Sequence, residues 1–480
     1  MKLSRLAQFA ALVPVKRTRI LVTLTLFLVT LMLSLVTLAP GLARAQMPDW
    51  KRFTLENGLE VLVVENHLVP IITIELAVKN GSFTEPAEYN GLSHLYEHMF
   101  FTSNARETTE DAFLEKVDDL GIIYNGETHE ENVQYYFTLP KENFEKGLDF
   151  MATAITSPLF KQDELEKQRV IVLGEFDRNE ALPLFNFGRK INQALWGDLI
   201  SRKEPLGQRT MIASATQDQM RTIQKQYYIP NNSLLIIAGD VTLDQAKALV
   251  PKHFSSWQRG LEPFKKDPTP VVKPLKRTIF VIDTVDQPTA TVMMRWHGPS
   301  IGKDDKGTYA ADVFSFIITQ SEHEFKKKLE ESGLAQGTNF WYYTQRYVGP
   351  IQADIQTTPE NLERVMKTFW EQVEKFDDPN YYTDEELETA KQVLRTQTLY
   401  RSEQLSSFSQ DLAFWWASAS LDYYEKYLES LGKITRKDIK EYVQRYVQNK
   451  PLVLGVAMSE DAMGRINLDM NKLTAKGVRP

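Results

Sequence analysis

Two distant segments of this 480-residue chain read alike. "TQDQMRTIQKQYYIPNNSLLIIAG" begins at Thr216 and "TRKDIKEYVQRYVQNKPLVLGVAM" begins at Thr435, and they align without a gap. Each predicts an amphipathic helix with a threonine cap, then a loop, then an apolar strand. "FLEKVDDLG" from Phe113 also resembles "FKKKLEESG" from Phe325, and "PKEN" resembles "TPEN". Amphipathic helices resemble one another by chance, but three matches in the same order favour an internal duplication.

The duplication predicts two related α+β domains and so constrains the fold strongly. We expect a first domain at residues 46–258 and a second at residues 278–480, each of ordinary domain size. The proline- and lysine-rich stretch "RGLEPFKKDPTPVVKPLKR", residues 259–277, predicts the linker between them.

The first copy also indicates which α+β architecture to expect. "RFTLENGLEVLVVEN" alternates like an antiparallel hairpin that turns at Asn57-Gly58, and "IITIELAVKNGS" and "VQYYFTLP" read as further strands. Strands joined mostly as sequential hairpins, with helices packed on one face, describe a sandwich with a mostly antiparallel sheet rather than a Rossmann fold. The helices are expected at residues 91–101, 109–119, 142–156 and 162–180.

The N-terminus resembles a secretory signal. Basic residues precede an apolar run, Ile20 to Leu38, and a small-residue "ARA" site follows. This order predicts cleavage after Ala45, so that residues 1–45 are a signal peptide and the protein is exported across the bacterial inner membrane, to the periplasm or beyond. The alternative is an uncleaved anchor in that membrane, because the run is nearly long enough to span a bilayer.

Composition excludes several classes of function. Removing residues 1–45 removes six basic residues and no acid, which leaves a net charge of −13. Such a surface repels nucleic acid and suits a soluble exported protein. The chain has no cysteine, which excludes disulfides and thiolate metal ligands, and it has no glycine-rich phosphate-binding loop.

The stretch "GLSHLYEHMFF" places His94 and His98 four residues apart, with Glu97 between them. On a helix, residues i and i+4 share a face, so both imidazoles can bind one metal ion. Glu97 then lies beside the ion, where a carboxylate can act as a base for water. The alternative is a pair of surface or capping histidines, but the apolar neighbours favour a buried face on which unpaired imidazoles are unfavourable.

The same stretch resembles the signature of the insulinase/pitrilysin (M16) family of zinc peptidases, an inverted H-x-x-E-H motif. The resemblance covers nearly the whole chain after residue 45. In that family the third zinc ligand is a glutamate that follows the motif after 76 residues, and the matching position here is Glu175. The resemblance therefore implies one Zn²⁺ per chain, held by His94, His98 and Glu175, with Glu97 as the catalytic base.

Other family positions are matched less completely. Asn125, in "YNGETHEENVQYY", corresponds to an asparagine that holds substrate backbone in the family, and the strand around 133–137 would pair with the substrate. Many members have a glutamate where this chain has Gln168, which could still orient a metal ligand by hydrogen bonding. The family's second half often supplies an Arg and a Tyr, and Leu329 and Gln336 occupy those positions here.

The second copy of the duplication has no metal ligands. Aligning the two helices places Ala310, Val313 and Phe314 where the first copy has the two histidines and the glutamate, and Gln397 lies near the position of the third ligand. We therefore expect one metal site in each chain.

These observations predict an exported zinc endopeptidase that hydrolyses peptides or unfolded polypeptides. A protease for the maturation of a cofactor would differ only in its substrate. The alternative is a weakly active or non-catalytic metal-binding subunit, since Gln168 and the missing Arg and Tyr depart from the family. Because family members build a chamber from four such domains, we expect a homodimer or a heterodimer with a related M16 chain. We expect no nucleic-acid partner, and membrane contact only through an uncleaved N-terminal segment.

Overall fold

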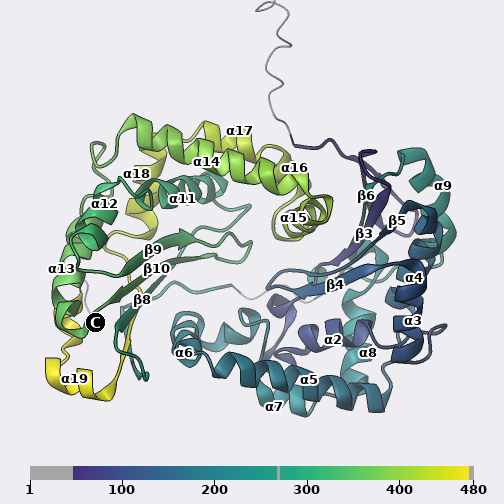
Figure 1. The fold of residues 1–480 in the computed structure, drawn as a ribbon, viewed down its shortest axis with the longest axis horizontal. Coiled ribbons are helices and arrows are strands. Elements are labelled where there is room, and N and C mark those ends of the chain that lie inside the picture. The colour runs from purple at the N-terminus through teal and green to yellow at the C-terminus, as the bar shows by residue number, and fades with distance from the viewer. Residues whose placement is uncertain (1–46, 267–270, 475–480) are drawn as a thin grey trace, which may run out of the picture. The chain divides into compact units, whose positions relative to one another are not determined.

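The computed structural model describes residues 47–266 and 271–474 (Figure 1). The predicted signal peptide lies outside the described residues. None of the helices within those two ranges combines the length and the hydropathy that a membrane span requires.

The first half of the described chain forms a six-stranded sheet in the order β1-β2-β6-β3-β5-β4. All neighbouring strands are antiparallel except β2 and β6, which run parallel. Its strands and helices are β1 (Lys51–Thr54), β2 (Glu60–Glu65), β3 (Ile71–Val78), α2 (Leu92–Phe100), α3 (Glu110–Leu120), β4 (Ile123–Thr128), β5 (Val133–Pro140), α4 (Phe144–Thr156), α5 (Gln162–Glu180), α6 (Phe185–Trp196), α7 (Arg209–Ala213), α8 (Gln217–Tyr227), β6 (Ser233–Gly239), α9 (Leu243–Phe254) and α10 (Pro263–Lys266).

The second half forms a five-stranded sheet in the order β7-β11-β8-β10-β9. Its only parallel neighbours among the described strands are β7 and β11. Its strands and helices are β7 (Ile279–Thr284), β8 (Ala290–His297), α11 (Asp305–Ile318), α12 (Glu324–Lys326), β9 (Gly337–Tyr342), β10 (Pro350–Thr357), α13 (Leu362–Val373), α14 (Asp384–Glu403), α15 (Leu405–Ser418), α16 (Leu421–Glu425), α17 (Tyr427–Gly432), α18 (Arg436–Tyr446), β11 (Val453–Met458) and α19 (Glu460–Ile466).

The two sheets repeat one strand order, which supports the duplication. Strands β2, β6, β3, β5 and β4 correspond in turn to β7, β11, β8, β10 and β9, and only β1 has no counterpart. The expected α+β class with mostly antiparallel sheets is confirmed. The expectation of mostly sequential hairpins is wrong at one place, because β6 inserts between β2 and β3. The described residues from Pro48 onward pack as one compact unit, so the proposed domain boundaries stay predictions.

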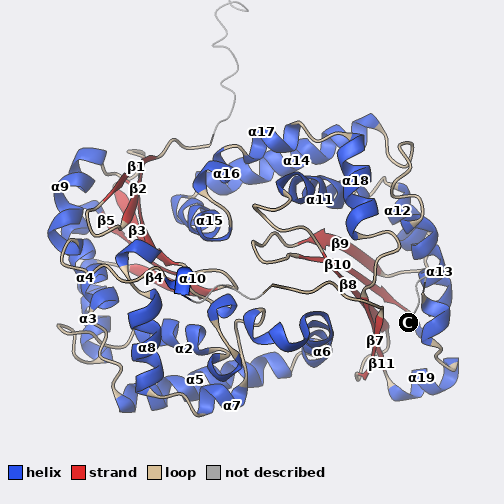
Figure 2. Cartoon of the chain, turned by 180° about the vertical axis from the view of Figure 1, so that it is seen from behind, coloured by secondary structure: helices blue, strands red, loops and turns tan. Residues whose placement is uncertain are grey.

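Each sheet has a second face that packs against a helix from the other half. The face of β3 that includes Ile74 belongs to the core of the first half, whereas Glu75 on the opposite face lies near Ser409 of α15. In the same way α6 packs on the second sheet, where Phe187 and Ile191 contact Gly455 of β11 so closely that a Cβ there would overlap them. Helix α15 of the second half thus packs on the first sheet, and helix α6 of the first half packs on the second sheet (Figure 2).

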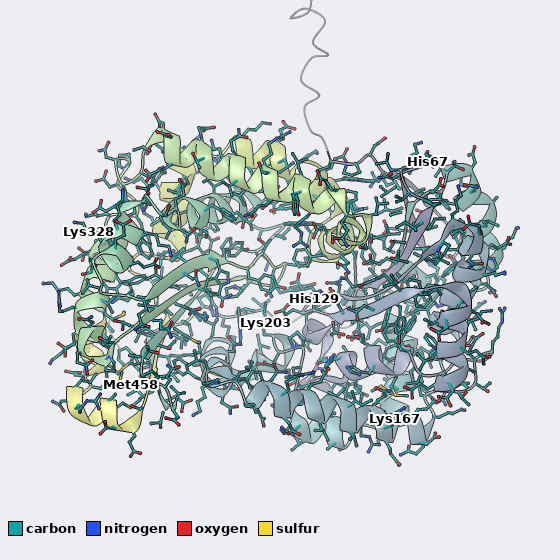
Figure 3. The ribbon with its side chains drawn as sticks, in the orientation of Figure 1. His67, His129, Lys167, Lys203, Lys328 and Met458 are labelled. Atoms are coloured by element: carbon teal, nitrogen blue, oxygen red, sulfur yellow. The ribbon has the colours of Figure 1, made fainter. Side chains whose placement is uncertain are left out.

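A buried polar junction also joins the two halves. The ammonium of Lys203, which is labelled in Figure 3, donates hydrogen bonds to the backbone carbonyls of Tyr347 and Val348, at 2.7 and 3.0 Å. The Glu131 carboxylate accepts from the backbone N–H groups of Arg346 and Tyr347. Because these groups are shielded from water, their mutual hydrogen bonds avoid the penalty of burying them unpaired.

Candidate metal centre

Helix α2, which carries the histidine pair, is held tightly at its first residues. Gly91, the residue before it, has a left-handed backbone with φ of 93°, and a Cβ there would lie 2.8 Å from the carbonyl oxygen of Leu206. Only glycine fits both the conformation and the close approach. The apolar face of α2, with Leu92, Leu95 and Met99, is fully buried in the core of the first half.

The three expected ligand residues converge at this helix. The distance from His94 Nε2 to Glu175 Oε2 is 3.4 Å, and that from His98 Nε2 to the same oxygen is 3.9 Å. Two ligands at zinc bond lengths of 2.0–2.1 Å in a tetrahedral arrangement lie about 3.4 Å apart, so the donor set fits a zinc ion. Within residues 47–266 and 271–474, this is the one group of three or more such side chains close enough to share an ion.

The two imidazoles are held in the neutral form that binds a metal. Burial lowers the pKa of His94 to about 3. Burial also lowers the pKa of His98, against the opposing influence of the Glu175 carboxylate. Neutral imidazole nitrogens carry the lone pair that a metal ion needs, so neither ring must first lose a proton near pH 7.

The groups around the ligands orient them. Gln168 is buried, and its Oε1 lies 3.3 Å from His98 Nδ1. A hydrogen bond from Nδ1–H to this oxygen leaves Nε2 as the metal-binding nitrogen. Arg178 pairs with the other oxygen of Glu175, Oε1, at 3.3 Å. The Nδ1 atom of His94 is buried and has no hydrogen-bond partner among the described residues.

Glu97 is buried beside the ligand group. Its Oε2 accepts a hydrogen bond from Thr128 Oγ1 at 3.0 Å. A Cβ at Gly126 would lie 2.9 Å from the Glu97 carboxylate, so a glycine on β4 leaves the space that this side chain fills. Burial raises the pKa of Glu97 to about 7, and the Thr128 hydrogen bond opposes that rise. A carboxylate with such a pKa can take and return a proton near neutral pH.

The position of β5 contradicts the expectation that residues 133–137 pair with a substrate. Residues 133–137 lie in β5, which is already paired on both sides, by β3 and β4, so they are not free to bind a substrate strand. The free edge belongs to β4, where Asn125 is exposed and lies opposite Tyr136 of β5. His129, just beyond β4, lies 3.2 Å from Glu127 and outside the group of three ligands.

Leu329 and Gln336, which replace the expected Arg and Tyr, lie in local structure of the second half. Leu329 is fully buried, within a π-helical turn, and the backbone N–H of Gln336 bonds to Gln356. The guanidinium of Arg346 donates to the backbone carbonyls at the end of α15, those of residues 417–419. Arg346 is therefore engaged in the junction between the halves.

Two sequence models match the chain in succession. Residues 60–199 match the model described as "Insulinase (Peptidase family M16)", and residues 214–394 match the "Peptidase M16 inactive domain". Together they span more than half of the chain, and the second model begins within the first half, before α8 and β6. The chain belongs to the insulinase (M16) family of peptidases.

Two relatives of this M16 chain match it over most of their own length, and a solved structure shares its fold. An uncharacterized zinc protease of Rickettsia felis is 26% identical over 75% of this chain and 85% of the relative. The uncharacterized zinc protease YmxG of Bacillus subtilis is 24% identical over 74% of this chain and 85% of its own length. A solved protease structure from Helicobacter pylori matches with a TM-score of 0.76 at 20% identity, covering 86% of this chain and all of that one, which shows the shared fold.

Some residues around the centre of this M16 chain were not singled out from the sequence. Arg178 and Thr128 contact Glu175 and Glu97, and Glu85 binds the backbone at the start of α2. An i, i+3 spacing after Glu175 is a signal for Arg178. Thr128 and Glu85 come from a strand and a loop, and no local periodicity points to them.

Proposed function

We propose that this protein is a zinc-dependent endopeptidase that hydrolyses peptides or unfolded polypeptides. His94, His98 and Glu175 hold one Zn²⁺, and Glu97 acts as general base and acid. The observation that carries the proposal is the convergence of two neutral imidazoles and one carboxylate oxygen within 4.8 Å of one another, with a second, non-ligating carboxylate, that of Glu97, beside them. Peptidase activity is also consistent with the relatives named zinc proteases.

Each residue of the site would have a separate role in hydrolysis. Zn²⁺ held by His94, His98 and Glu175 would supply Lewis-acid chemistry, polarising a scissile carbonyl and making water a nucleophile near neutral pH. Glu97 takes a proton from the attacking water at its carboxylate and later delivers it to the nitrogen of the leaving amine. Thr128 keeps that carboxylate in place through its hydrogen bond. Gln168 and Arg178 fix the orientation of two of the ligands.

We propose that the substrate binds as an added strand at the free edge of β4. Gly126 of β4 lies against Glu97, so a strand paired there passes the base and the ligands. Asn125, exposed on the same strand, would hydrogen-bond the substrate backbone. Recognition through backbone groups reads few side chains, which predicts broad specificity.

The partner and the location also remain proposals. Since the Arg and Tyr expected in the second half are absent, we favour a homodimer or a heterodimer with a related M16 chain that brings such groups to the site. Export follows only from the N-terminal sequence, residues 1–45, and an uncleaved anchor is the alternative.

A second candidate function is a weakly active or non-catalytic metal-binding subunit. Gln168 can orient His98 but cannot carry charge or exchange protons as a glutamate would. Arg346, the nearest arginine in sequence to the missing position, is occupied by three carbonyl groups. This candidate predicts zinc binding with little cleavage.

The test is Glu97→Gln, assayed on a quenched fluorescent peptide together with zinc analysis. We expect cleavage to fall by about 10³-fold, within the range of general acid–base contributions, while one zinc per chain is retained. Glu115→Gln, an exposed change on α3, is the control and should leave both unchanged. A chelator should stop the wild-type reaction. Undiminished cleavage by Glu97→Gln would contradict the proposal, whereas a zinc-bound wild type that does not cleave, alone or with a related chain, favours the second candidate.

A further inference from the structure

A buried glutamate holds the N-terminus of the metal-binding helix. Glu85 is 3% exposed, and its two carboxylate oxygens accept hydrogen bonds from different backbone amides. Oε2 accepts from Gly91 N–H at 2.7 Å and Oε1 from Ser93 N–H at 2.6 Å. Gly91 itself has no side chain to cap α2, so Glu85, six residues earlier, performs that role.

The second half holds the corresponding amide with a carboxylate as well. Gly307 corresponds to Gly91 in the duplication, and its N–H donates to Asp304 Oδ1 at 3.1 Å. The other oxygen of Asp304 pairs with Arg445 of α18 at 2.9 Å. Arg445 therefore neutralises the capping carboxylate of α11, the helix without metal ligands.

The first half lacks this neutralising cation. Gln226 occupies the position in α8 that corresponds to Arg445 in α18. The largest influences on the Glu85 carboxylate are burial and hydrogen bonds to residues 90–93, and none of them comes from a lysine or an arginine. Within the described part of the chain, the half that has metal ligands is the half that leaves its capping carboxylate without a positive partner.

A helix N-terminus carries a partial positive charge, which opposes the binding of a cation nearby. His94 is the third residue of α2, and helical side chains point back over the preceding turn. Its imidazole therefore presents a metal ion close to the positive end of the helix. A buried anion at that end cancels the repulsion, and it acts strongly because little water screens it.

We infer that Glu85 is a positioning residue of the metal centre, whose buried charge and paired amide bonds allow His94 to hold a divalent cation beside the positive end of α2. The inference rests on the proposed zinc site and adds a residue outside the ligand set to it. Burial raises the pKa of Glu85 to about 7, but both oxygens accept N–H donors, which suits the ionised form, and a bound cation favours that form further.

The test compares zinc affinities, measured by competition with a chelating dye, for three variants of the full chain. Glu85→Gln removes the charge and turns an amide N–H toward a backbone N–H, so we expect zinc affinity to fall about 10- to 100-fold. Asp304→Asn makes the equivalent change in the second half and should leave zinc affinity within about twofold. Glu88→Gln, an exposed glutamate in the same loop, should behave like wild type.

Three outcomes overturn the inference. If Glu85→Gln binds zinc as tightly as Asp304→Asn while both lose similar thermal stability, Glu85 is a structural cap and nothing more. If the wild type binds no zinc, the proposed metal site is wrong and the inference fails with it. Failure of the proposed function is thus distinguished from failure of the Glu85 role alone. Should Glu85→Gln not fold, hydrogen exchange of the wild type decides: zinc must slow exchange at the Gly91 and Ser93 amides, and an unchanged rate contradicts the role.

Discussion

Helices α2 and α11 occupy corresponding positions in the two halves but carry different side chains on the corresponding face. Each follows the long strand at the middle of its sheet, has an N-terminal amide held by a carboxylate, and packs against a long helix, α5 or α14. Where α2 has its histidines and glutamate, α11 has Ala310, Val313 and Phe314, all fully buried. The fold therefore does not require a metal site at this position; it offers a buried helix face that either hydrophobic packing or ligands can occupy.

The difference lies in what those positions contribute to stability. Phe314 packs against the rings of Phe340, Phe376 and Tyr442. The imidazoles in α2 contribute little hydrophobic burial, and one of their nitrogens, His94 Nδ1, is buried without a partner among the described residues. Polar groups of this kind are tolerated in a core when they serve a site.

The largest expected effects come from matched truncations, His98→Ala and Phe314→Ala. His98→Ala should remove zinc and reduce peptide cleavage about 10³-fold or more, with a small change in the stability of the metal-free protein. Phe314→Ala should lower the free energy of unfolding by about 3–5 kcal/mol through loss of burial and an internal cavity, while zinc content is unchanged. Zinc analysis and urea denaturation in the presence of chelator measure both. The comparison breaks if His98→Ala destabilises the metal-free protein as much as Phe314→Ala does.

A second difference between the halves is a buried acid in the first sheet. Glu75 is fully buried on the β3 face that meets α15, and neither carboxylate oxygen has a hydrogen-bond partner among the described residues. Burial raises its pKa from the ordinary 4.5 to about 8. By strand register Glu75 lies opposite Ile236, and the corresponding residue of β8, opposite Gly455, is Met293.

Replacing Glu75 by Met should therefore stabilise the protein, increasingly so at higher pH. The folded state keeps the Glu75 proton up to pH about 8, whereas the unfolded chain loses it near 4.5, so the contribution of Glu75 to stability falls as pH rises between these values. We expect Glu75→Met to gain about 3 kcal/mol at pH 8 and much less at pH 5. Urea denaturation at both pH values measures this gain, with exposed Glu56→Gln as control. A gain independent of pH would show that Glu75 is not neutral in the folded protein.

Much of this architecture followed from local sequence patterns. The helix expected at 162–180 and the strand "VQYYFTLP" match α5 and β5 at both ends, because hydrophobic periodicity and turn residues act over a few positions. The side chains of His94, His98 and Glu175 were expected together, and they are brought together. The first two follow from helix geometry, while the third required the likeness to a known family.

The failures share one cause, which is that they depend on partners far apart in the chain. The insertion of β6 between β2 and β3 is a choice among strands of similar pattern, and so is the pairing of β4 outside β5. The packing of α6 on the second sheet and of α15 on the first depends on which sheet face each helix covers. Periodicity states which side of an element is buried but not what covers it.

The smallest expected effects lie where the halves are alike, at the caps of α8 and α18. Thr216 and Thr435 are both exposed, and each forms a capping box with the residue three positions later, Gln219 or Asp438. Thr216→Ala and Thr435→Ala should each lower the free energy of unfolding by about 1 kcal/mol, since each leaves a helix N–H without its acceptor. The Thr435 change should be the larger by a few tenths, because the buried carboxylate of Asp438 loses one donor and keeps its ion pair with Lys306. Thr→Ser at either position keeps the hydroxyl and serves as control in urea denaturation. The two caps would not be equivalent if one truncation left stability unchanged while the other lowered it by about 2 kcal/mol. The similarity between the halves would then be limited to their strand order.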